Sequence, residues 1–328
     1  MRRPSFRSAI LLALAALFAA ALTACGGDDD GSDGGDEPVP APEASSFPAA
    51  SGTLNALTSE VTPTDQYVVS PAGQVFNQGR QRFSFGVFTV DGDQVTDADV
   101  AIYVAPGPTG KAQGPFPARI ENLETEPAFT AQTTSQDPDA AKAVYVTDVT
   151  FDQPGEWRIV AAIKQDGELL GSLLPSIDVR AKDPVPKVGD EAPVVHTPTA
   201  DDVGDISQID TRVPPSSMHD TDLADVIGEK PVVLLFATPA LCTSRVCGPV
   251  VDVAEQVKRE VGDKAAFIYQ EIYNDNDPNK GPRPPVQAYS LRSEPWLFVI
   301  DAEGRVSTRI EGAFSVAELQ DAVDRVTQ

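Results

Sequence analysis

Two cysteines, Cys242 and Cys247, lie in one hexapeptide and are the residues of this chain best suited to chemistry. Thiols this close in sequence can form a disulfide when their Cα atoms come within about 4.4–6.8 Å of each other. Five residues of straight helix would separate them by about 7.5 Å in rise alone. We therefore expect Cys242 to lie in a turn and Cys247 at or near the N-terminus of the helix that follows.

The residues around the pair favour a reactive sulfur. The amide groups and the dipole at a helix N-terminus stabilise a thiolate. Arg245 adds a positive charge between the two cysteines, which also favours the thiolate. Pro249 suits the first turn of a helix, and Phe236, Pro239 and Leu241 predict an apolar rim on which a thiol substrate can dock.

The elements that must position the pair follow from the hydrophobic pattern. The continuous apolar run at 231–237 is typical of a strand buried on both faces. Residues 249–261 place apolar side chains on one helical stripe. Further strands are expected at 265–272 and 296–300, with a turn at 301–304 and a partner strand at 305–310. Ser315 predicts the cap of a last helix, with Glu318 completing a capping box.

Residues 186–328 resemble the thioredoxin-like superfamily, nearest its extracytoplasmic TlpA/redoxin branch. The similarity is carried by VGDEAP at 188–193, by the elements at 222–225 and 228–231, and by Glu294-Pro295 before WLFVIDAEGRV. The resemblance implies a thioredoxin-like α/β domain over 194–328 and thiol–disulfide oxidoreductase activity. It also implies a cis Pro295 that packs against the cysteine pair and exposes the backbone of Glu294 to a partner.

The chain departs from that family at three points. The usual C-x-x-C spacing is C-x-x-x-x-C here, and the segment from Cys247 to Val250 resembles C-G-P-C with valine replacing the second cysteine. Two alignments follow, so both cysteines remain candidates for the attacking thiol. The residue before the cis-proline is usually small or hydroxylated, whereas Glu294 is acidic, and a carboxylate there would oppose thiolate formation.

Residues 50–180 predict an antiparallel β-sandwich. Apolar residues alternate in RFSFGVF, DVAIYVA and GEWRIVAAI, which is typical of half-buried strands. Asp91-Gly92 and Asp166-Gly167 are hairpin signals. About seven short strands favour a sandwich. The segment 154–159 is similar to a late strand of bacterial immunoglobulin-like domains, and we expect Trp157 to be a core residue.

The N-terminus predicts export and lipid anchoring. Three arginines precede an apolar run at 9–21, which is typical of a signal peptide rather than a membrane span. Residues 1–25 end in Leu-Thr-Ala-Cys, which resembles a bacterial lipobox with Cys25 as the lipidated residue. Residues 26–49 are rich in Gly, Asp and Pro, so we expect a disordered tether; residues 181–193 predict a linker. These features place the protein on the extracytoplasmic face of the cell membrane, in an oxidising compartment where a disulfide persists.

Charge and motifs limit the partners. The net charge of −24 becomes −27 if the three arginines of the signal peptide are removed, which argues against nucleic acid as a ligand. The sequence carries no phosphate-binding glycine motif, histidine-based triad or zinc spacing, so we expect neither cofactor nor metal. The expected partners are extracytoplasmic protein thiols or disulfides, or a membrane electron donor, together with the membrane itself through the lipid on Cys25.

Three alternatives to an oxidoreductase stay open. In the first, the protein is a binding or structural lipoprotein whose sandwich carries the function, and Cys242 and Cys247 form a structural disulfide without redox activity. A copper-handling role like that of Sco-type chaperones would use soft thiolates for Cu(I), although His196 and His219 both precede Cys242; Met218-His219 is expected in an exposed loop. A peroxiredoxin motif fits from Ser244 to Cys247, but the distance from Pro239 to Ser244 is one residue too long.

Overall fold

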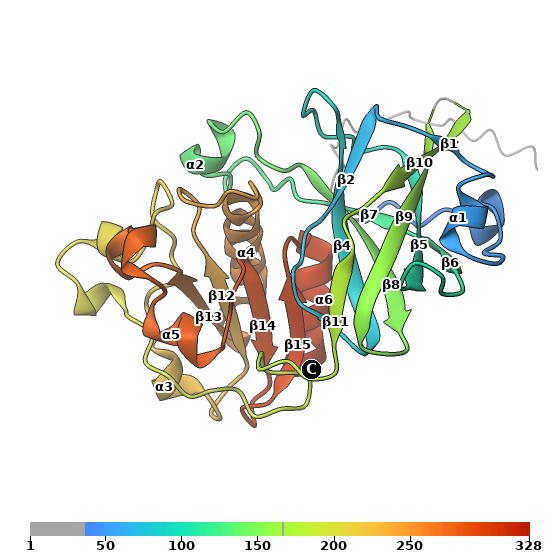
Figure 1. Cartoon of the computed structure of the whole chain (residues 1–328). Coiled ribbons are helices and arrows are strands. Elements are labelled where there is room, and N and C mark those ends of the chain that lie inside the picture. Colours follow the sequence, from blue (N-terminus) through green and yellow to red (C-terminus); the bar gives the residue numbers. More distant parts are fainter. Residues whose placement is uncertain (1–36, 166) are drawn as a thin grey trace, which may run out of the picture. The chain divides into compact units, whose positions relative to one another are not determined.

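The structure is a computed structural model that describes residues 37–165 and 167–328 (Figure 1). The predicted signal peptide, Cys25 and residues 26–36 of the predicted tether lie outside the described residues. Residues 37–328 all fall within one compact unit. Among them, no helix is both long enough and apolar enough to cross a membrane.

The N-terminal half is a β-sandwich of two sheets. One sheet has the order β2-β4-β8-β7, and the other has the order β1-β10-β9-β11-β3 with β5 and β6 added beside β9. The strands are β1 (Thr62–Pro63), β2 (Tyr67–Pro71), β3 (Phe76–Asn77), β4 (Gly79–Thr89), β5 (Asp99–Pro106), β6 (Gln113–Pro117), β7 (Arg119–Asn122), β8 (Ala143–Phe151), β9 (Gly155–Gln165), β10 (Glu168–Leu173) and β11 (Ile177–Arg180). The helical segments are η1 (Ala44–Ser46), α1 (Leu54–Leu57) and α2 (Gln132–Ser135).

The alternating residues form the sandwich core as predicted. Phe83, Phe85 and Val87 of β4 are buried between the sheets together with alternate residues of β5, β8 and β9. Trp157 is fully buried and packs edge-on against Phe151, and its indole Nε1 donates to the carbonyl oxygen of Gln153 at 3.0 Å. The expected role of Trp157 as a core residue is confirmed.

The sandwich differs from the prediction in two respects. Strands β1 and β3 are short and pair in parallel with β10 and β11, so pairing is not antiparallel throughout. Strands β5 and β9 are buried on both faces, because Phe47, Leu54 and Leu57 pack over the outward residues such as Tyr103. Apolar and polar residues alternate along a strand only when one of its two faces is exposed to water.

The C-terminal end of the predicted tether belongs to this packing. Val39 forms a backbone bridge with Ile120, and the carbonyl oxygen of Pro48 accepts a hydrogen bond from the hydroxyl of Tyr103. Phe47 is buried. Within the predicted tether of 26–49, residues 37–49 are therefore ordered against the sandwich, because Phe47 supplies apolar surface that can be buried.

The C-terminal half has a four-stranded mixed sheet with the order β13-β12-β14-β15. Strand β13 runs parallel to β12, and β14 runs antiparallel to both β12 and β15. The elements are η2 (Ala200–Asp202), η3 (Ile206–Gln208), α3 (Leu223–Val226), β12 (Val232–Ala237), α4 (Cys247–Val261), η4 (Gly262–Lys264), β13 (Ala266–Glu271), η5 (Asn274–Asn276), η6 (Pro278–Lys280), α5 (Pro284–Ala288), β14 (Trp296–Ile300), β15 (Val306–Glu311) and α6 (Val316–Thr327). This order of elements is thioredoxin-like, as the sequence predicts.

Helices cover both faces of this sheet. Val233 and Leu235 of β12 pack with α4 and α6, whereas Leu234 and Phe236 pack with Leu223 of α3 and with the region of α5. The predicted linker joins the second of these clusters, because Val185 is buried within it. The 181–193 segment is thus packed against the domain that it enters.

The sandwich and the thioredoxin-like half share part of a core. Val144 and Val146 of β8 lie in the same apolar cluster as helices α4 and α6. Arg82 of β4 donates to both carboxylate oxygens of Glu318 in α6, at 2.7 and 2.8 Å. The predicted capping box is therefore only half formed: Ser315 accepts from the amide of Glu318, while the Glu318 carboxylate binds Arg82.

Candidate functional site

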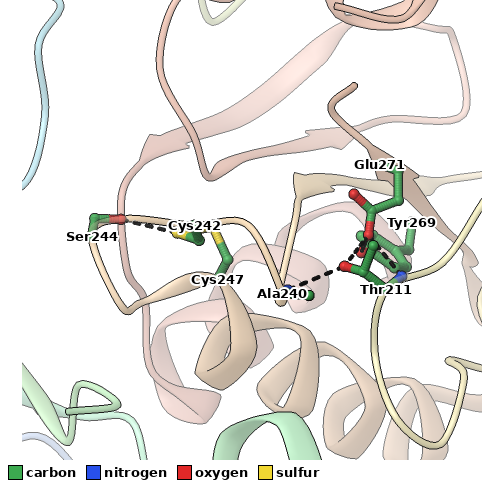
Figure 2. The surroundings of a disulfide bond; sticks show 7 residues. All are labelled: Thr211, Ala240, Cys242, Ser244, Cys247, Tyr269 and Glu271. Carbon is green, nitrogen blue, oxygen red and sulfur yellow. Dashed lines mark hydrogen bonds between the residues drawn. A yellow bond between two sulfur atoms is a disulfide. The ribbon is translucent and has the colours of Figure 1, made fainter. Parts of the chain in front are cut away.

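The two cysteines form a disulfide that joins a loop to the first residue of a helix (Figure 2). The Cα atoms of Cys242 and Cys247 are 6.0 Å apart. Cys242 lies in the loop that follows β12, and Cys247 begins α4. The geometry expected from the spacing, a turn leading into a helix N-terminus, is present.

The two sulfurs have different environments. Cys247 is fully buried, whereas Cys242 is partly exposed. The Sγ of Cys242 lies 3.1 Å from the Oγ of Ser244, which is itself exposed (Figure 2). A thiol partner from solution can therefore reach Cys242 before Cys247, which gives the pair an outer and an inner sulfur.

The N-terminus of α4, where the inner sulfur lies, has no side-chain cap. Val246 occupies the N-cap position and makes no side-chain cap hydrogen bond. Pro249 stands in the first helical turn, as expected, where a missing amide hydrogen costs no helical hydrogen bond. A thiolate at Cys247 would thus face amide groups that the N-cap side chain does not satisfy, which is the arrangement that stabilises it.

Arg245 lies beside the pair but is engaged elsewhere. Its guanidinium contacts Asp137 at 2.5 Å and Asp139 at 3.4 Å, and both aspartates belong to the segment between β7 and β8. Its backbone is left-handed, with φ of 61°. That Arg245 stabilises the thiolate stays a prediction, and its guanidinium is already paired with two carboxylates.

The segment 123–142, here called the arm, connects β7 to β8 and reaches the start of α4. The amide of Ala141 donates to the carbonyl oxygen of Arg245 at 3.0 Å, and the amide of Ala131 donates to buried Asp252 of α4 at 3.1 Å. Asp252 also pairs with Arg212 at 2.9 Å, and both side chains are buried. The arm therefore fixes the C-terminal end of the cysteine loop.

A buried carboxylate holds the other end of the loop. Glu271, at the end of β13, accepts hydrogen bonds from the amide and hydroxyl of Thr211 at 2.8 and 2.5 Å and from the hydroxyl of Tyr269 at 2.6 Å. The Thr211 Oγ1 in turn accepts from the amide of Ala240 at 3.2 Å (Figure 2). These hydrogen bonds connect Glu271 through Thr211 to Ala240, which lies two residues before Cys242.

Burial raises the pKa of Glu271, and the hydrogen bonds from Thr211 and Tyr269 partly oppose that effect. The cause is the cost of placing a charge away from water. Sequence reasoning missed Glu271 and Thr211. The available signal was an acidic residue at the end of the otherwise apolar run AAFIYQEIY, because a charged side chain in a buried strand needs partners.

The Glu294-Pro295 peptide is cis, in agreement with the resemblance. Pro295 is buried, and Glu294 is half-buried. Burial raises the pKa of Glu294, and a hydrogen bond from Tyr273 acts in the opposite direction. A charge on Glu294 is therefore less favourable than on a free glutamate.

The two histidines considered for copper are each paired with an aspartate. His196 pairs with Asp222 at 2.7 Å, and His219 pairs with Asp210 at 3.0 Å. Met218 and His219 are buried rather than in an exposed loop. Within 37–165 and 167–328, no group of three or more potential metal-ligating His, Cys, Asp or Glu side chains is found.

Comparisons with known proteins give fold-level likenesses. No protein-family model matches the chain, and no curated protein matches it. A thiol:disulfide interchange protein of the thioredoxin family from Chlorobium tepidum is 20% identical; the match covers 43% of this chain and 97% of that one, with a TM-score of 0.29. The Lin-41 filamin domain is 12% identical over 37% of this chain and 99% of that one, with a TM-score of 0.21.

A third solved structure also matches. The PKD domain of the human VPS10 domain-containing receptor SorCS2 is 16% identical; the match covers 38% of this chain and 79% of that chain, with a TM-score of 0.18. The topology described above combines a β-sandwich with a thioredoxin-like α/β half.

Proposed function

We propose that the protein is a membrane-anchored, extracytoplasmic thiol–disulfide oxidoreductase that uses Cys242 and Cys247. The observation that carries the proposal is the asymmetry of the pair: the disulfide connects a partly exposed sulfur in a loop with a buried sulfur at a helix N-terminus. An exchange reaction needs one accessible sulfur to meet the substrate and a second, protected sulfur to resolve the intermediate.

The reaction begins from the reduced pair. The thiolate of Cys242 attacks a substrate disulfide; the new sulfur–sulfur bond is a mixed disulfide, and one substrate sulfur leaves as a thiolate that takes up a proton. The thiolate of Cys247 then attacks the Cys242 sulfur and releases the second substrate thiol. Two electrons have passed to the substrate, and the pair is oxidised to its disulfide. Running the same steps backward oxidises a substrate dithiol.

The proposal places this chemistry outside the cytoplasm. Anchoring would come from lipid on Cys25, and the tether would let the folded part reach its partners. The substrates would be extracytoplasmic protein thiols or disulfides. A pair that works as a reductant would be reduced again by a dithiol electron donor in the membrane.

Trapping experiments on the full chain in detergent test the proposal. With Cys247→Ser, we expect a long-lived mixed disulfide on Cys242, because the resolving thiol is gone. With Cys242→Ser, adduct formation with the same disulfide substrate should fall by about a hundredfold or more, because the remaining sulfur is buried. Mass spectrometry of the adduct identifies the cysteine that reacts.

The reduction potential of the pair separates the proposal from an inert staple. Exchange proteins have potentials of about −270 to −120 mV, whereas structural disulfides lie below about −300 mV. A potential inside the first range supports exchange. A potential below the second limit, together with no adduct in the Cys247→Ser variant, would leave a structural disulfide and end the proposal.

A further inference from the structure

A cavity of about 550 Å³ lies beside the cysteine loop. It is lined by residues of strands β2 and β4 and the 92–94 turn, by the end of the arm and the start of β8, and by residues Thr243 to Val246 of the cysteine loop. This volume is within the range of about 300–1,000 Å³ that is typical of ligand sites. Neither half of the protein forms the cavity alone.

The floor of the cavity is apolar. Gly86 has no side chain, and the ring of Phe88 lies across it: a Cβ on Gly86 would come within 2.6 Å of that ring. Ala72, Ala140 and Ala141 complete the lining near this floor, and all of them are only partly buried. The floor is therefore apolar surface that remains open to an occupant.

The cavity lies next to the outer sulfur of the disulfide, although Cys242 itself is not a lining residue. Ser244 lines the cavity, and its Oγ lies 3.1 Å from the Sγ of Cys242. An occupant of the cavity thus lies one side chain away from the sulfur that is accessible to substrates.

We propose that the cavity binds the stretch of polypeptide next to the substrate's reactive cysteine, with an apolar side chain on the floor formed by Gly86 and Phe88. The inference rests on the proposed function and adds the place where a polypeptide substrate docks, a cavity to which the sandwich contributes. A small thiol needs only access to Cys242 and gains nothing from a floor several residues wide, whereas a polypeptide gains from burying a side chain there. The sandwich then takes part in substrate recognition.

The rim of the cavity adds little charge selection. Asp93 and Lys142 are exposed on it with opposite charges, and Arg245 is already paired with Asp137 and Asp139. Selection should therefore depend on apolar surface. Burial of a leucine side chain there should raise the reaction rate about tenfold, which corresponds to about 1.4 kcal/mol.

The test compares two matched peptides on the Cys247→Ser form of the full chain in detergent. Each peptide carries one cysteine as a mixed disulfide with glutathione, and the two differ only in a leucine or a glycine two residues from that cysteine. The measurement is the second-order rate constant for forming the peptide adduct on Cys242. We expect the leucine peptide to react about tenfold faster than the glycine peptide.

Two substitutions that fill the cavity locate the effect. With Ala140→Trp on the arm, or Ser70→Trp on β2, the leucine-to-glycine ratio should fall to about one. The matched control is Ala56→Trp, because Ala56 is exposed on α1 and does not line the cavity; the ratio should stay near ten. Each ratio is internal to one variant, so a general change in the reactivity of Cys242 cancels.

The outcomes separate this inference from the proposed function. A ratio of one in the parent, or a ratio of ten that survives both filling substitutions, overturns the docking site while exchange at Cys242 stands. Failure of both peptides to form any adduct on Cys242 overturns the proposed function itself. Thermal melting of each variant identifies any that does not fold, and the two filling positions lie on separate segments, β2 and the arm, so that one remains informative.

Discussion

The backbone amide of Ala141 donates a hydrogen bond to the carbonyl oxygen of Arg245, at 3.0 Å, and so joins the arm of the sandwich to the cysteine loop. At the other end of the loop, the amide of Ala240 is held by Thr211. The loop that carries Cys242 is thus fixed on both sides, by one segment from each half of the chain. This arrangement makes the sandwich part of the support of the site.

The first prediction concerns Arg245. Because Asp137 and Asp139 already compensate its charge, Arg245→Ala should change the alkylation rate of Cys242 at pH 7 by less than about twofold, measured with iodoacetamide in the Cys247→Ser background. The matched variant, Asp137→Ala with Asp139→Ala, leaves the guanidinium uncompensated and should raise that rate. A large fall in rate for Arg245→Ala would mean that the arginine does act on the sulfur.

The second prediction concerns the contact between the arm and the start of α4. A Cβ on Gly248 would lie 2.8 Å from the Oγ1 of Thr134. Gly248→Ala should therefore destabilise the protein by about 1–3 kcal/mol, as overpacking does. In a Thr134→Ala background the obstacle is removed, and the same substitution should be neutral or stabilising by up to about 1 kcal/mol through helix propensity.

Urea unfolding of the four proteins in this cycle gives the coupling between the two positions. If Gly248→Ala lowers the free energy of unfolding by the same amount in the parent and in the Thr134→Ala background, the arm does not contact the helix at this point. A coupling of the predicted sign would indicate that the arm and the helix carrying Cys247 stay in contact in solution.

The third prediction concerns the ion pair between Arg82 and Glu318. Both side chains are largely buried, and the guanidinium contacts both carboxylate oxygens. A double-mutant cycle with Arg82→Ala and Glu318→Ala should give a coupling of about 1–3 kcal/mol. The control is Arg80 of β4 with Asp148 of β8, an exposed pair at 2.9 Å whose coupling should be much smaller. If the Arg82–Glu318 and Arg80–Asp148 couplings were equal, the packing of β4 against α6 would be contradicted.

Much of the fold follows from periodicity in the sequence. The continuous apolar run before Cys242 predicted β12, and the stripe from Val250 to Val261 predicted α4, because burial on two faces or on one stripe leaves a regular pattern. The position of Cys247 at the helix start followed from the reach of a disulfide. These are local consequences of residue type, so one sequence is enough to find them.

The support of the site depends on contacts between distant segments, which no local pattern records. Thr211 and Glu271 are 60 residues apart, and Ala141 meets Arg245 across the boundary between the two halves. The arm reads as a polar loop in sequence, although it binds α4 through Asp252. The sequence predicted that Glu318 completes a capping box. Its carboxylate instead binds Arg82, because this arginine of β4 competes for it. Such outcomes depend on the assembled core.

The last prediction concerns the pH dependence of stability at Glu271. Burial raises the pKa of Glu271 in the folded protein above its value in the unfolded chain, so the folded state holds this proton more tightly. The contribution of Glu271 to the stability of the parent should therefore fall as pH rises from the ordinary glutamate value toward the raised one, and remain constant above it. Glu271→Gln removes this titration and keeps an oxygen that accepts from Thr211 and Tyr269. Its free energy of unfolding relative to the parent should rise through that window, by about 1.4 kcal/mol for each tenfold difference in proton affinity.

Asp222 provides a control of opposite sign. Its burial acts to raise its pKa, but hydrogen bonds from His196, Thr197 and Ala224 outweigh that effect and hold the pKa below the usual value. Its contribution to stability is present above the ordinary aspartate value and is lost as pH falls through the lowered one. Asp222→Asn should consequently be less stable than the parent at neutral pH, with the difference shrinking in acid. Urea unfolding from pH 3 to 8 measures both variants, and a Glu271→Gln curve that runs parallel to the parent at every pH would mean that Glu271 titrates normally and is not the buried anchor of the cysteine loop.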